Sequence, residues 1–355
     1  MRARHAGSGA ARVREQRIVT ARALAAVVKE HAADAVLLAG DVFEDNGVDR
    51  ADVQRVIDAC VGFGVPVFVL PGNHDPLVAG SVWEHPGWEH AANVTVLRAA
   101  SPVECAPGVM LYPAPATAKT SSSDPTAWMS DAPFDGTRVG IAHGTVQGAL
   151  VAEDCFPIPR NAPAQRGLAY LALGHWHSTA FYEDDHDTVR MAYSGAHEPT
   201  KFGERDSGNV LIVDLPGRGA APVLTRVPTG RLAWHQIIQE LGGAVDLDAV
   251  VREVEALPDP EHSLLELRLG GTIRPAQMRE LERLRGLIAA RFPLLGRLDD
   301  ARLIPEPDSD AWADALGAGL LSDVAAHLRE GGGEHASAAL MLLYRYGTEA
   351  GEVVA

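Results

Sequence analysis

The first pattern along the chain is amphipathic. Between residues 12 and 29, apolar residues recur every three or four positions, which predicts a helix. These residues are Ile18, Ala21, Leu24, Ala25 and Val28. The apolar run 35–39 follows and ends at Gly40-Asp41, so we expect the helix to lead into a buried strand.

The same alternation of helix and strand then repeats. Residues 49–62 are amphipathic, and the apolar, β-branched run 65–70 stops at Pro71-Gly72. Two consecutive units of this kind predict a largely parallel sheet covered by helices. Further strands are expected at 109–112, 138–142, 169–173, 189–194 and 209–215. The Ser-, Thr- and Pro-rich stretch 116–135 is interpreted as a long surface loop between two of them.

The pattern changes after about residue 230. Leu- and Arg-rich helical patterns at 245–256 and 275–290 surround one alternating run, 263–269, which predicts a strand. The division that follows is an α/β domain at 1–230, a small α+β capping domain at 231–304, and a linker with a helical tail at 305–355. Glycines 331–333 should interrupt the tail helix.

Composition places the chain among soluble globular proteins, because 46% of its 355 residues are hydrophobic and 22% are charged. It lacks the roughly 18–20 consecutive apolar residues of a membrane helix, and residues 1–16 lack the apolar core of a signal peptide. We therefore expect a cytoplasmic protein with no membrane partner. Its three cysteines form no CxxC pair, which argues against a disulfide framework or a thiolate zinc site.

Net charge limits the choice of partner. A formal charge of −16 repels a polyanion unless basic patches, metal ions or another protein offset it. A two-metal site would add about four positive charges that a residue count does not include. Tight binding of DNA by the unaided polypeptide is therefore disfavoured.

Polar clusters follow four of the expected strands directly. They are Gly40-Asp41, Gly72-Asn73-His74-Asp75, His143-Gly144 and Gly174-His175-Trp176-His177. In open α/β sheets ligands bind at the carboxyl ends of strands, so the four clusters are expected to meet at one rim. Each cluster alone has a plainer interpretation as a turn, a helix cap or a structural histidine.

Together the clusters offer one carboxylate, one amide oxygen and three imidazoles. Mixed oxygen and nitrogen ligation suits Mn, Fe or Zn better than Ca or Mg. Two such ions roughly 3.5–4 Å apart can activate water and hold both oxygens of a phosphoryl displacement. The chemistry expected of this site is phosphoester hydrolysis.

In order and spacing, these clusters resemble the signatures of calcineurin-like metallophosphoesterases. Residues 37–43 and 193–204 resemble the bacterial SbcD-type exonucleases of DNA double-strand-break repair, and the overall likeness extends over about residues 12–215. The resemblance implies a four-layered metallophosphoesterase sandwich with a small α+β capping domain. It also implies a manganese-dependent nuclease subunit that acts on DNA beside an SMC-like coiled-coil ATPase, with a homodimer expected.

The resemblance assigns roles to individual residues. The implied metal ligands are Asp41, Asn73, His143, His175 and His177. Asp41 would bridge two divalent ions, His177 would bind the first, and the other three would complete the second. The implied catalytic residues are His74, which would stabilise the transition-state phosphate or protonate the leaving oxygen, and Asp75, which would orient His74 or brace the loop.

One part of the family pattern is absent from the printed sequence. The motif Asp-x-His, which follows the first strand in the family, does not occur before Asp41. The first metal would keep only Asp41 and His177, so the second site should be the better formed. Our favoured explanation is that Met1 is a late or truncated start, with the missing strand and motif upstream; the runner-up is degeneration to a one-metal or inactive subunit.

Three functions remain open from the sequence. The leading one is Mn-dependent exonuclease or endonuclease activity in double-strand-break repair. A phosphodiesterase or phosphatase for small phosphoesters is the second. The third is a non-catalytic subunit that binds the ATPase and has lost its first metal site.

Overall fold

The structure is a computed structural model, and it divides the chain into two compact units at residues 232/233. The sequence places this boundary at 230/231. The residues that the structure describes are 9–131, 134–148, 155–217, 219–242, 246–306, 316 and 319–352.

The first unit begins with the two helix–strand pairs that the sequence predicts. Their elements are α1 (Ala10–Glu30), β1 (Val36–Ala39), α2 (Arg50–Val61) and β2 (Val67–Leu70). A third strand, β3 (Val94–Val96), completes a parallel sheet in the order β1-β2-β3. The central strand β2 is buried along its whole length, whereas β1, at the edge, is only half-buried.

A larger, mixed sheet holds the later strands of this unit in the order β10-β11-β9-β6-β5-β4. Its strands are β4 (Val103–Ala106), β5 (Val109–Ala114), β6 (Thr137–His143), β9 (Tyr170–Gly174), β10 (Ala180–Glu183) and β11 (Val189–Tyr193). The inner pairs are parallel, and the two edge pairs are antiparallel. Most of the predicted strands are therefore divided between these two sheets, while the one predicted at 209–215 pairs in a separate two-stranded sheet.

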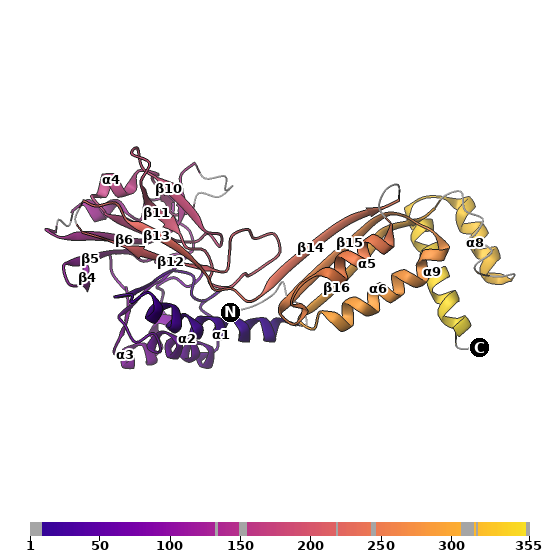
Figure 1. Cartoon of the computed structure of the whole chain (residues 1–355), viewed down its shortest axis with the longest axis horizontal. Helices are drawn as coiled ribbons and strands as arrows, with labels where there is room; N and C mark the ends of the chain where they lie inside the picture. The colour runs from indigo at the N-terminus through magenta and orange to yellow at the C-terminus, as the bar shows by residue number, and fades with distance from the viewer. Residues whose placement is uncertain are drawn as a thin grey trace. The chain divides into compact units, whose positions relative to one another are not determined.

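Apolar clusters on the two sheets arrange the unit in layers. Helices α1, α2 and α3 (Gly87–His90) cover the outer face of the small sheet around Val53, Ile57 and Trp83. The two sheets meet at a second cluster that includes Leu70 and Ile141. A third cluster lies on the far face of the large sheet under α4 (Ala162–Arg166). This sequence of helices, sheet, sheet and helices confirms the predicted mixed α/β class (Figure 1).

The described part of the stretch predicted as a surface loop, residues 116–131 and 134–135, includes a helix and a core residue. It contains the short helix η3 (Ala127–Asp131), and Met129 within it is fully buried in the core. The polar composition of the stretch predicts a loop and gives no sign of this buried apolar residue. Short elements complete the unit: η2 (Val82–Glu84), β7 (Thr145–Val146), β8 (Pro157–Ile158), β12 (Asn209–Asp214) and β13 (Val223–Pro228).

The second unit contains a parallel sheet instead of the single strand that the sequence predicts. The sheet has the order β14-β15-β16, with β14 (Ala233–Leu241), β15 (Ser263–Ile273) and β16 (Leu295–Pro305). Helices α5 (Leu247–Ala256) and α6 (Met278–Arg291) lie between consecutive strands. The prediction missed β14 and β16 because both mix apolar with charged residues and do not alternate cleanly.

The tail is helical, as predicted, and its helices α8 (Leu320–Gly331) and α9 (Glu334–Glu352) are separated by glycines. Tyr344 on α9 is buried, and its hydroxyl donates to the Pro275 carbonyl 3.0 Å away. Residues 305–308 were expected to be linker, but Pro305 belongs to β16, and 307 and 308 lie outside the described residues. The remaining short helices are η4 (Pro260–His262) and η5 (Pro275–Gln277).

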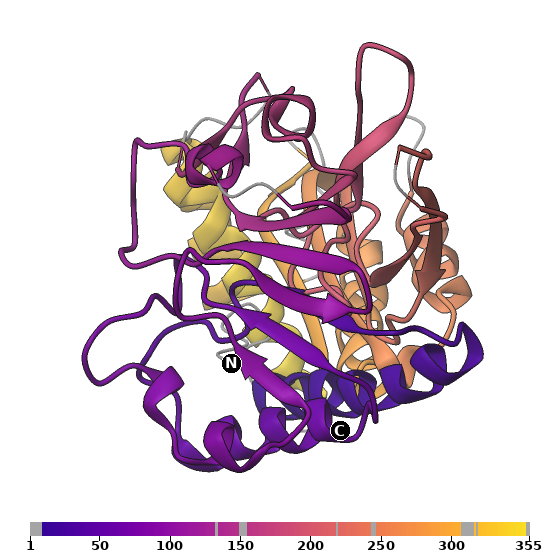
Figure 2. The same cartoon turned by 90° about the vertical axis from the view of Figure 1, so that its left-hand side faces the viewer.

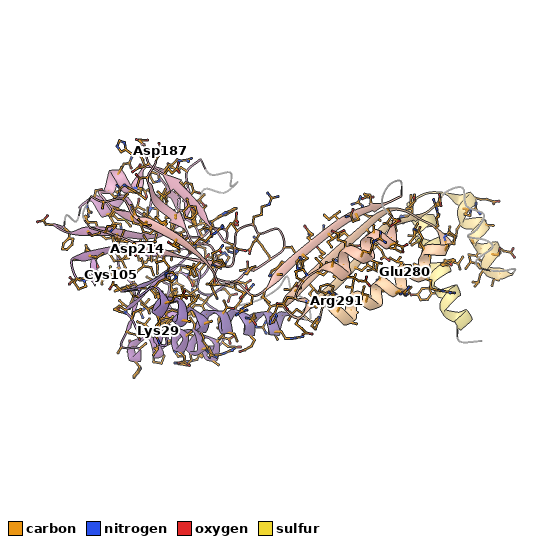
Figure 3. All side chains as sticks on the ribbon, in the orientation of Figure 1. Lys29, Cys105, Asp187, Asp214, Glu280 and Arg291 are labelled. Carbon is orange, nitrogen blue, oxygen red and sulfur yellow. The ribbon has the colours of Figure 1, made fainter. Side chains whose placement is uncertain are left out.

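The first unit has charged residues both at its surface and in its interior, where Arg17, Asp75 and Glu198 are buried. Lys29, Asp187 and Asp214, which Figure 3 labels, are exposed. Seen from the end in Figure 2, the indigo and purple helices lie beneath the strands of the first unit. Within the described part of the chain, no helix is long and apolar enough to cross a membrane.

Candidate metal centre

Four strands of the first unit end beside one another. Strands β1 and β2 end just before Gly40-Asp41 and Pro71-Gly72, while His143 is the last residue of β6. His143 is paired with Gly174, the last residue of β9, so His175 follows directly beside it. The parallel pairing of β6 with β9 therefore brings two histidines from distant parts of the sequence together, as the sequence argument requires.

The side chains at this rim converge closely. His143 Nε2 lies 3.1 Å from Asp41 Oδ2 and 2.9 Å from Asn73 Oδ1. His175 Nδ1 lies 3.2 Å from the same Asn73 oxygen and 3.3 Å from His143 Nε2. Among the described residues, Asp41, His143 and His175 form the cluster of His, Cys, Asp and Glu side chains with metal-ligand geometry.

Hydrogen bonding fixes which ring nitrogen of His143 faces the cluster. Its Nδ1 lies 2.8 Å from the Ala39 carbonyl and donates to it, so Nε2 points at Asp41 and Asn73. Burial lowers the pKa of His143, but its hydrogen bond to Asp41 and the attraction of that carboxylate outweigh burial and raise the pKa. The raised pKa reflects the attraction between His143 and Asp41 across their 3.1 Å contact.

The donor set fits a divalent cation. Burial, reinforced by repulsion from His143, lowers the pKa of His175 to about 4, so this ring is neutral near pH 7. The cluster therefore presents one carboxylate oxygen, one amide oxygen and two imidazole nitrogens to a common point. Lone pairs that converge at this spacing repel one another unless protons or a cation lie between them. Mixed oxygen and nitrogen donors suit a first-row transition metal.

Two glycines allow the loops to approach this closely. A Cβ atom at Gly72 would lie 2.3 Å from the Asp41 nitrogen, and one at Gly174 would lie 1.6 Å from the Ala39 oxygen. Two of the predicted ligand residues have strained backbones, with φ of 51° at Asp41 and 109° at His175. Strain of this kind persists where the surrounding structure enforces it and is concentrated at functional sites.

His74 lies at the rim without joining the cluster. Its backbone nitrogen donates to Asp41 Oδ1 at 2.9 Å, and its ring Nδ1 donates to the Glu44 carbonyl at 3.1 Å. The side chain is exposed, so Nε2 remains accessible from solvent. This placement suits a group that meets a substrate.

Asp75 braces two loops instead of orienting His74. Its side chain is fully buried, and its oxygens accept hydrogen bonds from the backbone nitrogens of Gly72 at 2.6 Å and Phe43 at 2.9 Å. Burial raises its pKa to about 6, and the nearby Asp41 carboxylate adds to the rise. Of the two roles considered for Asp75, the contacts favour the brace; it is a positioning residue with no access to substrate.

We expect Asp75→Ala to destabilise the first unit. The change removes the acceptor of two buried amide groups, each costing about 1–3 kcal/mol when left unsatisfied. Urea unfolding should therefore show a loss of roughly 2–6 kcal/mol in the free energy of unfolding. The control is Asp58→Ala, because Asp58 is exposed and contacts only Gln54 in its own helix. Equal losses in both variants would contradict the brace.

His177 lies outside the convergent cluster. Its ring is 44% exposed, and Nδ1 is 2.7 Å from Glu204 Oε1 and 2.9 Å from the Thr200 hydroxyl. Burial raises the pKa of Glu204, but hydrogen bonds from His177 and Thr200 outweigh it and lower the pKa to about 2. Neither Glu204 nor Thr200 was predicted from the sequence to be a site residue, although both lie in the family-like segment 193–204.

Comparison with known proteins identifies proteins that are similar to this chain. The family model described as calcineurin-like phosphoesterase matches residues 14–179. The uncharacterized metallophosphoesterase YhaO of Bacillus subtilis is 29% identical over 258 residues, covering 69% of this chain and 60% of that protein. The DNA double-strand break repair protein Mre11 of Aeropyrum pernix is 26% identical over 242 residues, covering 59% of this chain and 54% of that protein.

The matched part of the chain thus spans between about half and three fifths of the length of these relatives. Among solved structures, TT1561 of Thermus thermophilus is similar with a TM-score of 0.42 at 10% sequence identity. That match covers 59% of this chain and 92% of the other.

Proposed function

We propose that the chain is a metal-dependent nuclease subunit that hydrolyses DNA phosphodiesters, because its residues 14–179 match the family model described as calcineurin-like phosphoesterase. The observation that supports hydrolysis most strongly is the convergence of Asp41, Asn73, His143 and His175 within hydrogen-bonding distance. The choice of DNA rests on the likeness to Mre11 and on the family-like segment 193–204.

The predicted site residues would then have distinct roles in phosphoester hydrolysis. Asp41, Asn73, His143 and His175 would hold the second of two metal ions, with Asp41 shared and His177 turned to the first. Divalent ions supply the Lewis acidity that phosphoester hydrolysis needs, and Mn²⁺ suits this donor set. His74 would place its Nε2 against the phosphate or the leaving oxygen, because its Nδ1 is held by the Glu44 carbonyl.

An SMC-like coiled-coil ATPase is the partner we propose. Such a subunit would help to overcome the repulsion between DNA and a chain of net charge −16. Exposed apolar side chains on the tail helices support a protein partner: Leu320 is 77%, Leu342 is 50% and Tyr346 is 62% exposed. A homodimer remains part of the same proposal.

Hydrolysis of small phosphoesters is the second candidate. It is favoured by the acidic net charge, which does not oppose the entry of a small substrate as it opposes a long polyanion. A non-catalytic, ATPase-binding subunit is the third, and the position of His177 outside the convergent cluster favours it.

A substrate panel with Mn²⁺ separates the three candidates. The purified chain is incubated with linear duplex DNA, a single-stranded oligonucleotide and bis(p-nitrophenyl) phosphate. The proposal expects Mn²⁺-dependent cleavage of DNA, which is absent from an Asn73→Ala variant purified in the same way. Cleavage of the small ester alone would support the second candidate. Inactivity on all substrates, with no Mn²⁺ bound, would contradict both enzymatic proposals.

A further inference from the structure

We propose that Glu204 is a positioning residue for His177, fixing the ring so that Nε2 is the nitrogen left available to a metal ion. The inference rests on the proposed function, since it explains how His177, a predicted metal ligand, is oriented. It concerns a carboxylate that has no direct access to substrate, because its side chain is only 4% exposed.

The contacts of His177 divide its two ring nitrogens. Nδ1 faces Glu204 Oε1 at 2.7 Å and the Thr200 hydroxyl at 2.9 Å. A carboxylate can only accept a hydrogen bond, so Nδ1 must carry the hydrogen. In the neutral ring Nε2 then keeps its lone pair. The side chain as a whole is 44% exposed.

The turn that presents Glu204 is built around the carboxylate. Thr200 donates to it twice, from its backbone nitrogen to Oε2 at 2.8 Å and from its hydroxyl to Oε1. Gly203, with φ of 80°, allows the chain to fold back within four residues of Thr200. With its oxygens already engaged, Glu204 is held in place before any metal ion arrives.

The first helix holds the same turn from the other side. Arg17 on α1 donates through Nη2 to the Thr200 carbonyl at 3.1 Å. His197 donates through Nε2 to the Arg17 carbonyl at 3.0 Å, and the Thr20 hydroxyl donates to the buried carboxylate of Glu198. The segment is therefore fixed to α1 at His197, Glu198 and Thr200, which supports the turn that orients His177.

His143, a neighbouring predicted ligand, is oriented by the same kind of hydrogen bond. His143 donates from Nδ1 to the Ala39 carbonyl, which directs its Nε2 into the cluster. Partners of this kind fix the tautomer and orientation of a metal-binding histidine, and their loss typically lowers metal affinity about 10- to 100-fold. Glu204 accepts the hydrogen bond from Nδ1 of His177, as a backbone carbonyl does for His143. Unlike the carbonyl, it also carries a negative charge.

Histidine-selective ¹⁵N NMR of the full chain tests the tautomer directly, with the His177 signal assigned from its loss in His177→Asn. We expect hydrogen on Nδ1 in the wild type and in Glu204→Gln, because the glutamine oxygen still accepts. Glu204→Ala should shift the ring toward hydrogen on Nε2. The Mn²⁺ concentration for half-maximal hydrolysis should rise about 10- to 100-fold in Glu204→Ala and less in Glu204→Gln.

The matched control is Glu266→Gln, which alters a buried carboxylate of the second unit that is bonded to Gln236 and Arg268. It should leave the His177 tautomer and the Mn²⁺ dependence unchanged. An unchanged tautomer in Glu204→Ala, or equal effects of the Glu266 and Glu204 variants, would overturn the inference. A wild-type chain with hydrogen on Nδ1 but no Mn²⁺ binding would contradict the proposed function and leave the role of Glu204 in orienting the ring intact.

Discussion

Replacing His74 with alanine is expected to lower kcat about 10²- to 10⁴-fold while Mn²⁺ binding stays at the wild-type level. The His74 ring is not among the convergent atoms, and its link to Asp41 runs through the backbone nitrogen, which alanine retains. The variant should therefore keep the metal site and lose only the group that meets the phosphate or the leaving oxygen.

Steady-state kinetics together with a Mn²⁺ titration measures both effects on one preparation. His90→Ala is the matched control, because His90 is also exposed and its Nδ1 also donates to a backbone carbonyl, that of Pro86. Since His90 lies in α3, away from the strand ends, its variant should turn over normally. Full activity in His74→Ala, or loss of Mn²⁺ with it, would show that the assigned role is wrong.

Asn73→Ala and His175→Ala should each abolish Mn²⁺ binding and hydrolysis without unfolding the protein. Each substitution removes one of the convergent donor atoms. Neither side chain belongs to the apolar core, so little packing is lost. In metal-free protein the free energy of unfolding should be unchanged or slightly higher, because fewer lone pairs face one another.

Calorimetric Mn²⁺ titration and thermal unfolding without metal, run in parallel, test this separation. Asn93→Ala provides the opposite case, because its amide donates to three backbone carbonyls, those of Cys60, Val61 and Val65. That variant should lose stability and keep Mn²⁺ binding. Should Asn73→Ala unfold as readily as Asn93→Ala, its side chain would have a structural role and the ligand assignment would be in doubt.

The elements that position the metal centre were predictable from the sequence. The strands that precede Asp41, Asn73 and His175 are short apolar runs that end at glycine, and a buried strand leaves this pattern whatever its neighbours are. Because parallel strands end at one edge, the convergence of these side chains followed from chain order alone.

The features that could not be predicted from the sequence depend on contacts between residues that are far apart along the chain. Which of the two sheets a strand joins depends on how the faces of the sheets pack together. The apolar pattern of the strands is the same in both sheets, so it does not predict this assignment. The brace formed by Asp75 and the support of His177 by Glu204 require knowing which backbone groups lie opposite a carboxylate. In the second unit, β14 and β16 are recognised only by pairing with β15, since their own patterns are weak.

The most direct test of a metal-dependent phosphoesterase is a reconstitution assay. The chain is stripped of metal with a chelator, and phosphodiester hydrolysis is measured as Mn²⁺ is returned, for the wild type and for His175→Ala. We expect activity to vanish on stripping, to return with Mn²⁺ in the wild type, and to stay absent in the variant. Hydrolysis that survives stripping, or that returns equally in both proteins, would contradict the assignment of this site.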